Sequence, residues 1–437
     1  MAKLGLFDAK VPRYTSYPTA PNFGAAVDSA QHTSWIEQIP SGSKISLYVH
    51  VPFCRRLCWF CAYRTQGTQS DAPIHAYLES LKAEIALLKT HLPKGLTLSR
   101  LHWGGGTPTI LSPEMISDLA SDLFDLAPMA ADGEFLVEVD PIEFDQARCD
   151  ALIRAGMSQA SIGVQDFDPQ IQQSIGRLQS YEVTGSAVEM LRAHGVKTVS
   201  AEILFGLPHQ TQKQLATSLQ LLLSLSPERV ALLGYAHVPW MARRQSMIPS
   251  GSLPTPQDHL ALFNSAAQIL YAEGFASIGM DHFAHPDDPL AQARKAGCLR
   301  RGFQGYTDDP APVLIGLGVS AISRFPQGYS QNHGSTTRYT SALEQGHFAT
   351  LQGHVFGPGD ALRGRLIEML LCQFAISPQA IRQEFPESAA LLDQLLAQTV
   401  ARFPGVFEQD AEGLHLPQPC RPLARMIAQS FDAYTSS

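Results

Sequence analysis

The sequence predicts an α/β protein built around a parallel sheet, with a mainly helical region at its C-terminal end. Six short apolar segments of strand length alternate with segments of helical periodicity, which is typical of strand–helix units. Polar or glycine-rich residues directly follow several of the apolar segments. In barrel proteins the catalytic residues lie at the carboxyl ends of the strands, so this pattern favours a partial α/β barrel over a doubly wound sheet.

Each predicted element has its own signal in the sequence. We expect strands near residues 45–51, 98–103, 134–139, 159–165, 198–204 and 229–236. Between the first two strands we expect an amphipathic helix, which starts near Asp71 and Pro73 and whose apolar residues share one face. Those residues are Ile74, Tyr77, Leu78, Leu81, Ile85 and Leu88. A later helix over 180–194 ends at Gly195, a residue type common after helix C-termini.

Composition and pattern predict three regions. Residues 1–36 form an N-terminal arm, because the segment Pro12–Thr19 is too rich in proline and polar groups for a regular element. Residues 37–350 form the barrel, and residues 351–437 form a mainly helical C-terminal domain. The length of 437 residues and an apolar content of 45% allow a core of this size.

Charge and hydropathy exclude several classes of function. The formal charge of −8 and the lack of a long basic run disfavour nucleic-acid binding. No apolar segment reaches the length of a membrane span, and the first residues lack the apolar core of a secretion signal. We therefore expect a cytoplasmic protein, in which thiols stay reduced and an iron–sulfur cluster is stable.

Three cysteines form the most informative motif. Cys54, Cys58 and Cys61 follow the first predicted strand with the spacing C-x3-C-x2-C. Three thiolates hold three irons of a [4Fe-4S] cluster and leave the fourth iron open to a small molecule. A structural zinc site is the alternative, but it needs a fourth ligand and no second C-x2-C pair follows.

The other cysteines suggest no second metal site. They are scattered along the chain, and a disulfide framework is not expected from seven cysteines in a chain of this length. We expect ordinary buried cysteines at these positions. They are Cys149, Cys298, Cys372 and Cys420.

Longer motifs carry a family resemblance over nearly the whole chain. They are Pro12–Thr19, Tyr48–Cys54, Leu101–Thr109, Gly163–Phe167, Tyr235–His237, Gly279–Phe283, Phe303–Tyr306 and Gly318–Ser323. By these motifs the chain resembles the radical S-adenosylmethionine enzymes, and among them the oxygen-independent coproporphyrinogen III oxidases (dehydrogenases) of bacteria. The three-cysteine motif alone indicates only the superfamily, and the later motifs are more specific.

The resemblance implies a fold and a reaction. The fold is a partial (β/α)6 barrel with added strands and a helical C-terminal domain. The reaction is the anaerobic oxidative decarboxylation of coproporphyrinogen III to protoporphyrinogen IX in haem biosynthesis. A [4Fe-4S] cluster reduces S-adenosylmethionine to a 5′-deoxyadenosyl radical, which takes a hydrogen atom from the β-carbon of a propionate. The family pattern has room for two molecules of S-adenosylmethionine.

The resemblance also implies the roles of individual residues. Cys54, Cys58 and Cys61 are the expected cluster ligands. Gly105, Gly106 and Thr107 approach the methionyl end of the cofactor, although a glycine triplet is also typical of a tight turn. Glu138 contacts the cofactor, although a salt-bridged strand end would look the same. The complete set of implied cofactor contacts is Tyr48, Phe60, Gly105, Gly106, Thr107, Glu138, Gln165, Arg177, Glu202, Ala236 and Ile322.

Two positions depart from the family pattern. Tyr63 stands where the family usually has a fourth cysteine, which is not a cluster ligand. Glu202 stands where the family has aspartate, so the carboxylate lies one methylene further out. Gln165 and Arg177 belong to the implied second cofactor site, with Phe60 beside it, and the two departures bear on this region or on the substrate.

The implied substrate carries four carboxylates, so an acidic protein needs local positive charge to bind it. Arg13, Arg294, Arg300 and Arg301 are candidates, and solvated surface arginines are the alternative for each. The implied partners are this substrate and an electron donor that the sequence does not identify, and we expect a monomer.

Two other functions remain open within the superfamily. One is a haem-binding chaperone, which also lacks the fourth cysteine. The other is a radical methyltransferase that opens haem. The arm Pro12–Thr19 and the motifs Tyr235–His237 and Gly279–Phe283 favour the oxidase.

Overall fold

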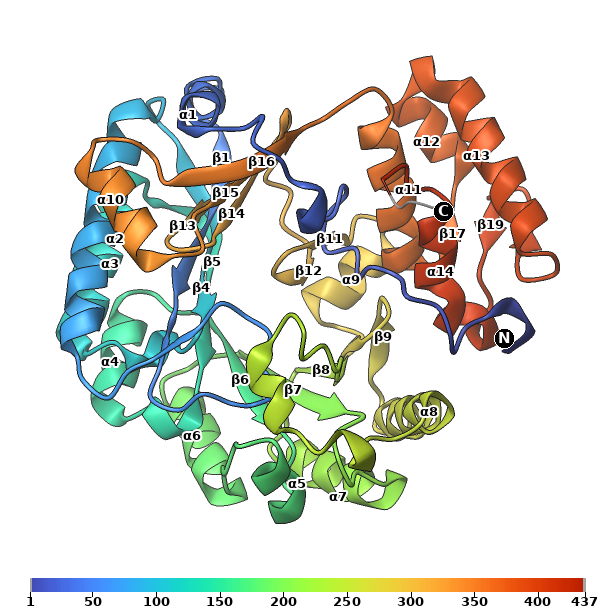
Figure 1. The fold of residues 1–437 in the computed structure, drawn as a ribbon, viewed down its shortest axis with the longest axis horizontal. Helices are drawn as coiled ribbons and strands as arrows, with labels where there is room; N and C mark the ends of the chain where they lie inside the picture. The colour runs from blue at the N-terminus through green and yellow to red at the C-terminus, as the bar shows by residue number, and fades with distance from the viewer. Residues whose placement is uncertain (1, 435–437) are drawn as a thin grey trace. The chain divides into compact units, whose positions relative to one another are not determined.

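The computed structural model describes residues 2–434, which form two compact units. We call residues 25–273 and 310–353 the barrel unit. We call the other three segments, Met1–Gly24, Gly274–Asp309 and His354–Ser437, the split unit. Both ends of the chain belong to the split unit. Figure 1 shows the elements of each unit.

The barrel unit is built on six neighbouring parallel strands. They follow one another in chain order across the sheet, as expected for successive right-handed strand–helix units. Most of their residues are buried, as in sheets that are covered on both faces. The strands are β1 (Lys44–Val51), β4 (Thr97–Gly105), β5 (Met129–Val139), β6 (Gln159–Gln165), β7 (Thr198–Phe205) and β8 (Arg229–Gly234).

Helices cover the outer side of these strands (Figure 1). Each buries an apolar stripe, and several begin at a capping side chain: Ser112 and Thr211, for example, accept hydrogen bonds from backbone amides of the first turn. The helices are α2 (Ala72–His91), α3 (Pro113–Leu126), α4 (Gln146–Arg154), α5 (Pro169–Ser174), α6 (Tyr181–Ala193), α7 (Gln212–Leu223) and α8 (Pro256–Ala272).

Further strands extend the sheet beyond β1. β13 (Leu314–Leu317) pairs in parallel with β1, so it stands on the side of β1 away from β4. β14 (Ile322–Phe325) and β15 (Gly328–Asn332) follow as antiparallel neighbours, and then comes β16 (Thr350–Val355), of which residues 350–353 belong to this unit. The helices α1 (Ser29–Glu37) and α10 (Thr336–Glu344) complete the unit.

The split unit is mainly helical and has its own core. Helix α11 (Asp360–Gln373) supplies several fully buried side chains, and Tyr14 and Tyr17 pack into the same core. Its other helices are α9 (Pro289–Lys295), α12 (Pro378–Glu384), α13 (Ala389–Arg402) and α14 (Ala424–Gln429). Its short strands are β9 (Ala276–Ile278), β10 (His282–Ala284), β11 (Arg300–Gly302), β12 (Gly305–Thr307), β17 (Ala375–Ile376), β18 (Glu408–Gln409) and β19 (Leu414–His415).

These elements confirm the predicted fold class. All six expected strands and the helices near 74–88 and 180–194 are present, and α6 ends just before Gly195, which has a positive φ of 81°. The boundaries proposed from composition at residues 36 and 350 stay predictions. No helix among residues 2–434 has the length and apolar character needed to cross a membrane.

Candidate metal centre and cofactor site

The three predicted cluster cysteines lie on one loop that follows β1. The loop leads from Val51 to α2 and contains the two-residue strands β2 (Phe53–Cys54) and β3 (Gln66–Gly67), which pair in parallel. All three thiols are free, with Cys58 buried and the other two half-buried. The pKa of Cys54 is raised to about 11, chiefly by burial and also by the neighbouring Cys61 and Cys58, while the hydrogen bond from Thr107 opposes the increase.

These thiols fit the ligand set of an iron–sulfur cluster. Their mutual effect on pKa shows that Cys54, Cys58 and Cys61 lie near one another. Within residues 2–434, no three His, Cys, Asp or Glu side chains are grouped around the position of a single metal ion. A four-iron cluster binds each cysteine through a different iron, so its thiolates stand farther apart than the ligands of one ion.

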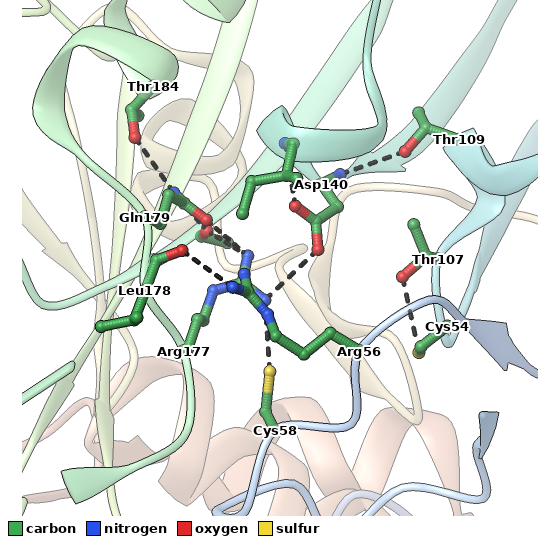
Figure 2. Close-up of polar contacts among 12 residues, drawn as sticks. Cys54, Arg56, Cys58, Thr107, Thr109, Asp140, Arg177, Leu178, Gln179 and Thr184 are labelled. Atoms are coloured by element: carbon green, nitrogen blue, oxygen red, sulfur yellow. Dashed lines mark hydrogen bonds and ion pairs between the residues drawn. The ribbon is translucent and has the colours of Figure 1, made fainter. Parts of the chain in front are cut away.

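Polar side chains from two other segments reach the cysteine sulfurs: Arg177 lies between α5 and α6, and Thr107 follows β4. Arg177 Nη1 donates to Cys58 Sγ over 3.4 Å, and Thr107 Oγ1 donates to Cys54 Sγ over 3.5 Å (Figure 2). Burial raises the pKa of Cys61, while the Tyr63 backbone and then the charge of Arg244 oppose the increase. A cluster ligand must be a thiolate, so donors and positive charge at these sulfurs favour the binding form.

Arg177 is the centre of a buried polar group (Figure 2). Its Nη1 lies 3.4 Å from Asp140 Oδ2, and its Nη2 donates to the Gly163 carbonyl and to Gln179 Oε1, each over 2.8 Å. Burial lowers the pKa of Arg177, but the charges of Asp140 and Cys58 more than compensate and the pKa is raised. The guanidinium therefore stays charged beside the cysteine loop.

Two buried polar atoms near this group have no hydrogen-bond partner among residues 2–434: Arg177 Nε and Gln165 Oε1. Gln165 lies where the β6–β7 register shifts, and its φ of 69° is in the left-handed region. Such irregularities redirect side chains at the ends of strands, often beside active sites. A buried donor and a buried acceptor without partners fit a site for a polar ligand.

Glu138 carries the negative charge of the site. Its Oε2 accepts a hydrogen bond of 3.1 Å from the Gly105 amide, and its Oε1 lies 3.2 Å from His102 Nε2. Burial alone would raise the pKa of Glu138, but the contact with His102 and the Gly105 amide outweigh it, and the pKa is lowered. The side chain is 36% exposed. An ionised, accessible carboxylate is suited to binding an ammonium group or hydroxyl groups.

The glycines after β4 allow a close approach of the backbone. Gly105 has a φ of 114°, and a Cβ there would lie 2.6 Å from the His50 ring. A Cβ on Gly106 would lie 2.7 Å from the Phe53 carbonyl oxygen, and one on Gly104 would lie 2.6 Å from Glu138 Oε1. The triplet is therefore closely packed, and any side chain would displace the residues beside it.

The other predicted contacts lie on strands of the barrel unit, just after a strand or on the cysteine loop. Phe60 packs against the apolar cluster that contains Ile171 and Leu204. Glu202 accepts a hydrogen bond of 3.3 Å from Ser161, and its charge contributes to the raised pKa of Arg177. The hydroxyl oxygen of Tyr48 lies 3.1 Å from His50 Nδ1. Ala236 follows β8 and Ile322 begins β14, and their roles, like those of the whole set, stay predictions.

Sequence reasoning missed three residues of this site. His102 pairs with Glu138, and its place in the motif Leu101–Thr109 was a signal that could have indicated it. Asp140 pairs with Arg177 and stands two residues after Glu138, at the same strand end. Arg244 donates to Thr65 Oγ1 over 2.7 Å beside the cysteine loop, and no local pattern indicates it, because 179 residues separate the two.

The chain is similar to known proteins in its sequence. Residues 48–222 match the model of the radical SAM superfamily. The chain is 56% identical to a protein of Cereibacter sphaeroides named oxygen-independent coproporphyrinogen III oxidase, and the match covers 100% of this chain and 97% of the relative. A protein of the same name from Paracoccus denitrificans is 55% identical, over 99% of this chain and 96% of the relative.

A solved structure agrees with this result. Coproporphyrinogen III oxidase (HemN) from Escherichia coli, described as a radical SAM enzyme, superimposes with a TM-score of 0.90 and 35% sequence identity. The match covers 97% of this chain and 98% of that structure. With the cysteine loop and the strand-end residues described above, these similarities show that the chain belongs to the oxygen-independent coproporphyrinogen III oxidase family of the radical SAM superfamily.

Proposed function

We propose that the protein converts coproporphyrinogen III to protoporphyrinogen IX without oxygen, by oxidative decarboxylation of two propionate side chains to vinyl groups. The observation that carries the proposal is the 56% identity, over the whole chain, to a relative with this named activity. Each conversion releases carbon dioxide and removes one hydrogen atom and one electron from the substrate.

The radical SAM superfamily uses a [4Fe-4S] cluster and S-adenosylmethionine. When bound, the two supply a 5′-deoxyadenosyl radical that takes a hydrogen atom from the propionate. Cys54, Cys58 and Cys61 would hold the cluster. Arg177 and Thr107 donate hydrogen bonds to two of these sulfurs, which orients the thiols and stabilises their deprotonated form.

The strand-end residues would bind and orient S-adenosylmethionine. Glu138 is ionised and partly accessible, so it would accept hydrogen bonds from the cofactor's ammonium or ribose hydroxyl groups. The backbone at Gly105 and Gly106 would approach the methionyl end closely. In the second site, Arg177 and Gln165 would supply the buried donor and acceptor that lack partners within the described residues 2–434.

The partners and the location of the protein belong to the same proposal. We infer a porphyrinogen substrate, an electron donor and a monomeric cytoplasmic protein. All seven cysteines are free, which fits a reducing compartment. The identity of the electron donor stays open.

An anaerobic assay tests the proposal against the haem chaperone. Purified protein with a reconstituted cluster is incubated with coproporphyrinogen III, dithionite and S-adenosylmethionine, and the porphyrins are oxidised and separated. We expect protoporphyrin to accumulate with time and with enzyme concentration. Protein that forms no divinyl product and instead retains added haem through gel filtration would support the chaperone and contradict the oxidase.

A further inference from the structure

The split unit contains a buried arginine that the proposed reaction has not yet used. Arg301 lies on β11, in register with Tyr306 of β12, and its guanidinium stacks over the Tyr306 ring at 4.6 Å from the ring centre. The side chain of Arg301 is only 8% exposed. Neighbouring residues of a strand point to opposite faces, so Arg300 and Arg301 have different surroundings.

Arg300 forms an ion pair with a carboxylate of the protein. Its Nη1 donates to Glu368 Oε2 over 2.7 Å, and Arg365 donates to the same oxygen over 2.8 Å. The other oxygen of Glu368 accepts the Arg301 backbone amide over 3.1 Å. Glu368 is thus satisfied by three donors, and Arg300 is already paired with this carboxylate.

The guanidinium of Arg301 is paired less closely with a carboxylate. Its Nε and Nη1 donate no hydrogen bond to any described residue between 2 and 434. The nearest carboxylate, Asp281 Oδ1, lies 4.0 Å from Nη1 and is bound by His282 Nδ1 at 2.8 Å. A buried charge with two unused donors is costly unless a ligand completes its hydrogen bonds.

Other positive charges surround this group. Burial lowers the pKa of Arg425 on α14, and repulsion from Arg13 lowers it further, with a smaller contribution from Arg301, while Asp281 opposes the shift. The arm that carries Arg13 is anchored in the same unit, because Tyr14 donates to Asp432 over 2.9 Å. The charges of these arginines act on one another near Asp281, and positive charge of this kind favours an anion.

We propose that Arg301, with Arg425 and Arg13 beside it, forms a carboxylate-binding site of the split unit that holds a propionate group of the porphyrinogen substrate. The proposal rests on the function proposed above. A guanidinium presents paired N–H groups that match the two oxygens of a carboxylate. S-adenosylmethionine also carries a carboxylate, so the test must separate the two sources.

Binding of coproporphyrin III, the fluorescent oxidised form of the substrate, tests the site without turnover. In fluorescence titrations of the full-length protein, we expect Arg301→Gln to weaken binding by about tenfold to a hundredfold, the usual effect of losing a hydrogen bond to a charged group. Arg425→Gln should weaken binding in the same direction, because Arg425 is one of the arginines of the proposed site. It serves as the second variant if Arg301→Gln folds poorly.

Arg300→Gln is the matched control, because it removes the neighbouring charge while Glu368 stays paired with Arg365. Its affinity for coproporphyrin III should equal that of the wild type. The tetramethyl ester of coproporphyrin III, which has no free carboxylate, should bind equally to all the variants, and so should S-adenosylmethionine measured by equilibrium dialysis.

The outcomes of these experiments distinguish a failure of the proposed carboxylate site from a failure of the proposed function. If the wild type converts coproporphyrinogen III while Arg301→Gln and Arg425→Gln both bind coproporphyrin III normally, the site is wrong and the function stands. If the variants lose affinity for the tetramethyl ester as much as for coproporphyrin III, the proposed site is also wrong. Such a result would show that the substitutions disturb the packing of the protein and do not remove a contact with a carboxylate. Loss of S-adenosylmethionine binding alone would assign the arginines to the cofactor instead. A wild type that neither binds nor converts the tetrapyrrole would refute both.

Discussion

Two residues of opposite charge define the chemistry of the barrel unit. Glu138 is held ionised by His102 and the Gly105 amide, and Arg177 is held charged between Asp140 and Cys58. S-adenosylmethionine carries a carboxylate, an ammonium and a sulfonium, so a site that binds it needs both signs of charge in fixed positions. In the function proposed above, Glu138 at the end of β5 would serve the cluster-bound cofactor, and Arg177, between α5 and α6, would serve the second one.

Replacing Gly105 with valine tests the close approach of the backbone. The φ of 114° is strained for a branched side chain, and the new Cβ would overlap the His50 ring. We expect the rate of reductive cleavage of S-adenosylmethionine to fall by at least about tenfold, because a displacement of the backbone by about 1 Å would misplace the cofactor. The iron content should change little, because the cysteine ligands are unchanged. The measurement is 5′-deoxyadenosine formed per iron bound.

Gly24→Ala is the control, because no heavy atom lies within 4 Å of its new Cβ. If Gly105→Val cleaves the cofactor as fast as this control, the triplet is only a turn.

Individual functional residues were predictable to different degrees. Cys54, Cys58 and Cys61 are evident from their spacing alone. Arg177 was implied only by the family resemblance, and its partner Asp140 was missed, because an ion pair between the end of β5 and the segment after α5 leaves no periodic signal. Such pairings depend on three-dimensional contacts that local sequence does not contain.

The elements of the barrel unit bring these residues together. The six predicted strands all exist, because apolar runs between helical segments are a strong local signal. The register shift at Gly163 and Gln165 was not predictable, since it depends on the pairing of β6 with β7.

A buried carboxylate links three further elements. Glu84 on α2 accepts hydrogen bonds from the Gly318 amide over 2.7 Å, from Asn332 over 2.6 Å and from Tyr339 over 2.7 Å. The Tyr77 hydroxyl of the same helix donates to the His50 carbonyl. This network connects α2 with the turn before Ile322 and with the end of β1 that leads to the cysteine loop.

The network predicts a pH-dependent stability. Burial raises the pKa of Glu84 from 4.5 to about 7, although its three hydrogen-bond donors oppose the shift. The folded state then binds this proton more tightly than the unfolded state, so the stabilisation is complete below pH 4.5 and is lost as the pH rises to about 7. The loss amounts to about 3 kcal/mol.

Glutamine has no titratable group, so comparing the wild type with Glu84→Gln isolates the contribution of the Glu84 carboxyl group to stability. We expect the difference in unfolding free energy between wild type and Glu84→Gln to decrease by about 3 kcal/mol as the pH rises through this range. Urea unfolding at several pH values measures it. Glu79→Gln, an exposed substitution on the same helix, is the control. A difference that stays constant with pH would refute the role of Glu84.

At the scale of the whole molecule, three separate segments of the chain form the split unit. Tyr14 and Tyr17 pack in one core with α11 and α14, and the Tyr17 hydroxyl accepts the Ala433 amide over 2.9 Å. The sequence indicated the arm and the C-terminal helices separately. It could not show that they join, because the residues in contact are more than 400 positions apart.

Tyr14→Phe tests the attachment of the N-terminal arm to the C-terminal helices. The substitution leaves Asp432 Oδ2 without its 2.9 Å donor, so we expect the unfolding free energy to fall by about 1 kcal/mol. We also expect tryptic cleavage after Arg13 to become several times faster, because the arm is released more often. Ser16→Ala, which removes only a local hydrogen bond to Pro18, should leave the cleavage rate unchanged. Equal cleavage rates in the two variants would contradict the anchoring of the arm by Tyr14.

The central claim is that the cysteine loop after β1 supports decarboxylation of the porphyrinogen. Its most direct test is a parallel measurement of 5′-deoxyadenosine and carbon dioxide during anaerobic turnover of coproporphyrinogen III by the wild type, Cys58→Ser and Cys298→Ser. The last variant changes an exposed thiol outside the loop. We expect both products from the wild type and Cys298→Ser, with two molecules of carbon dioxide per divinyl product, and neither above background from Cys58→Ser. Wild-type yields from Cys58→Ser, or cofactor cleavage by the wild type without carbon dioxide, would contradict the claim.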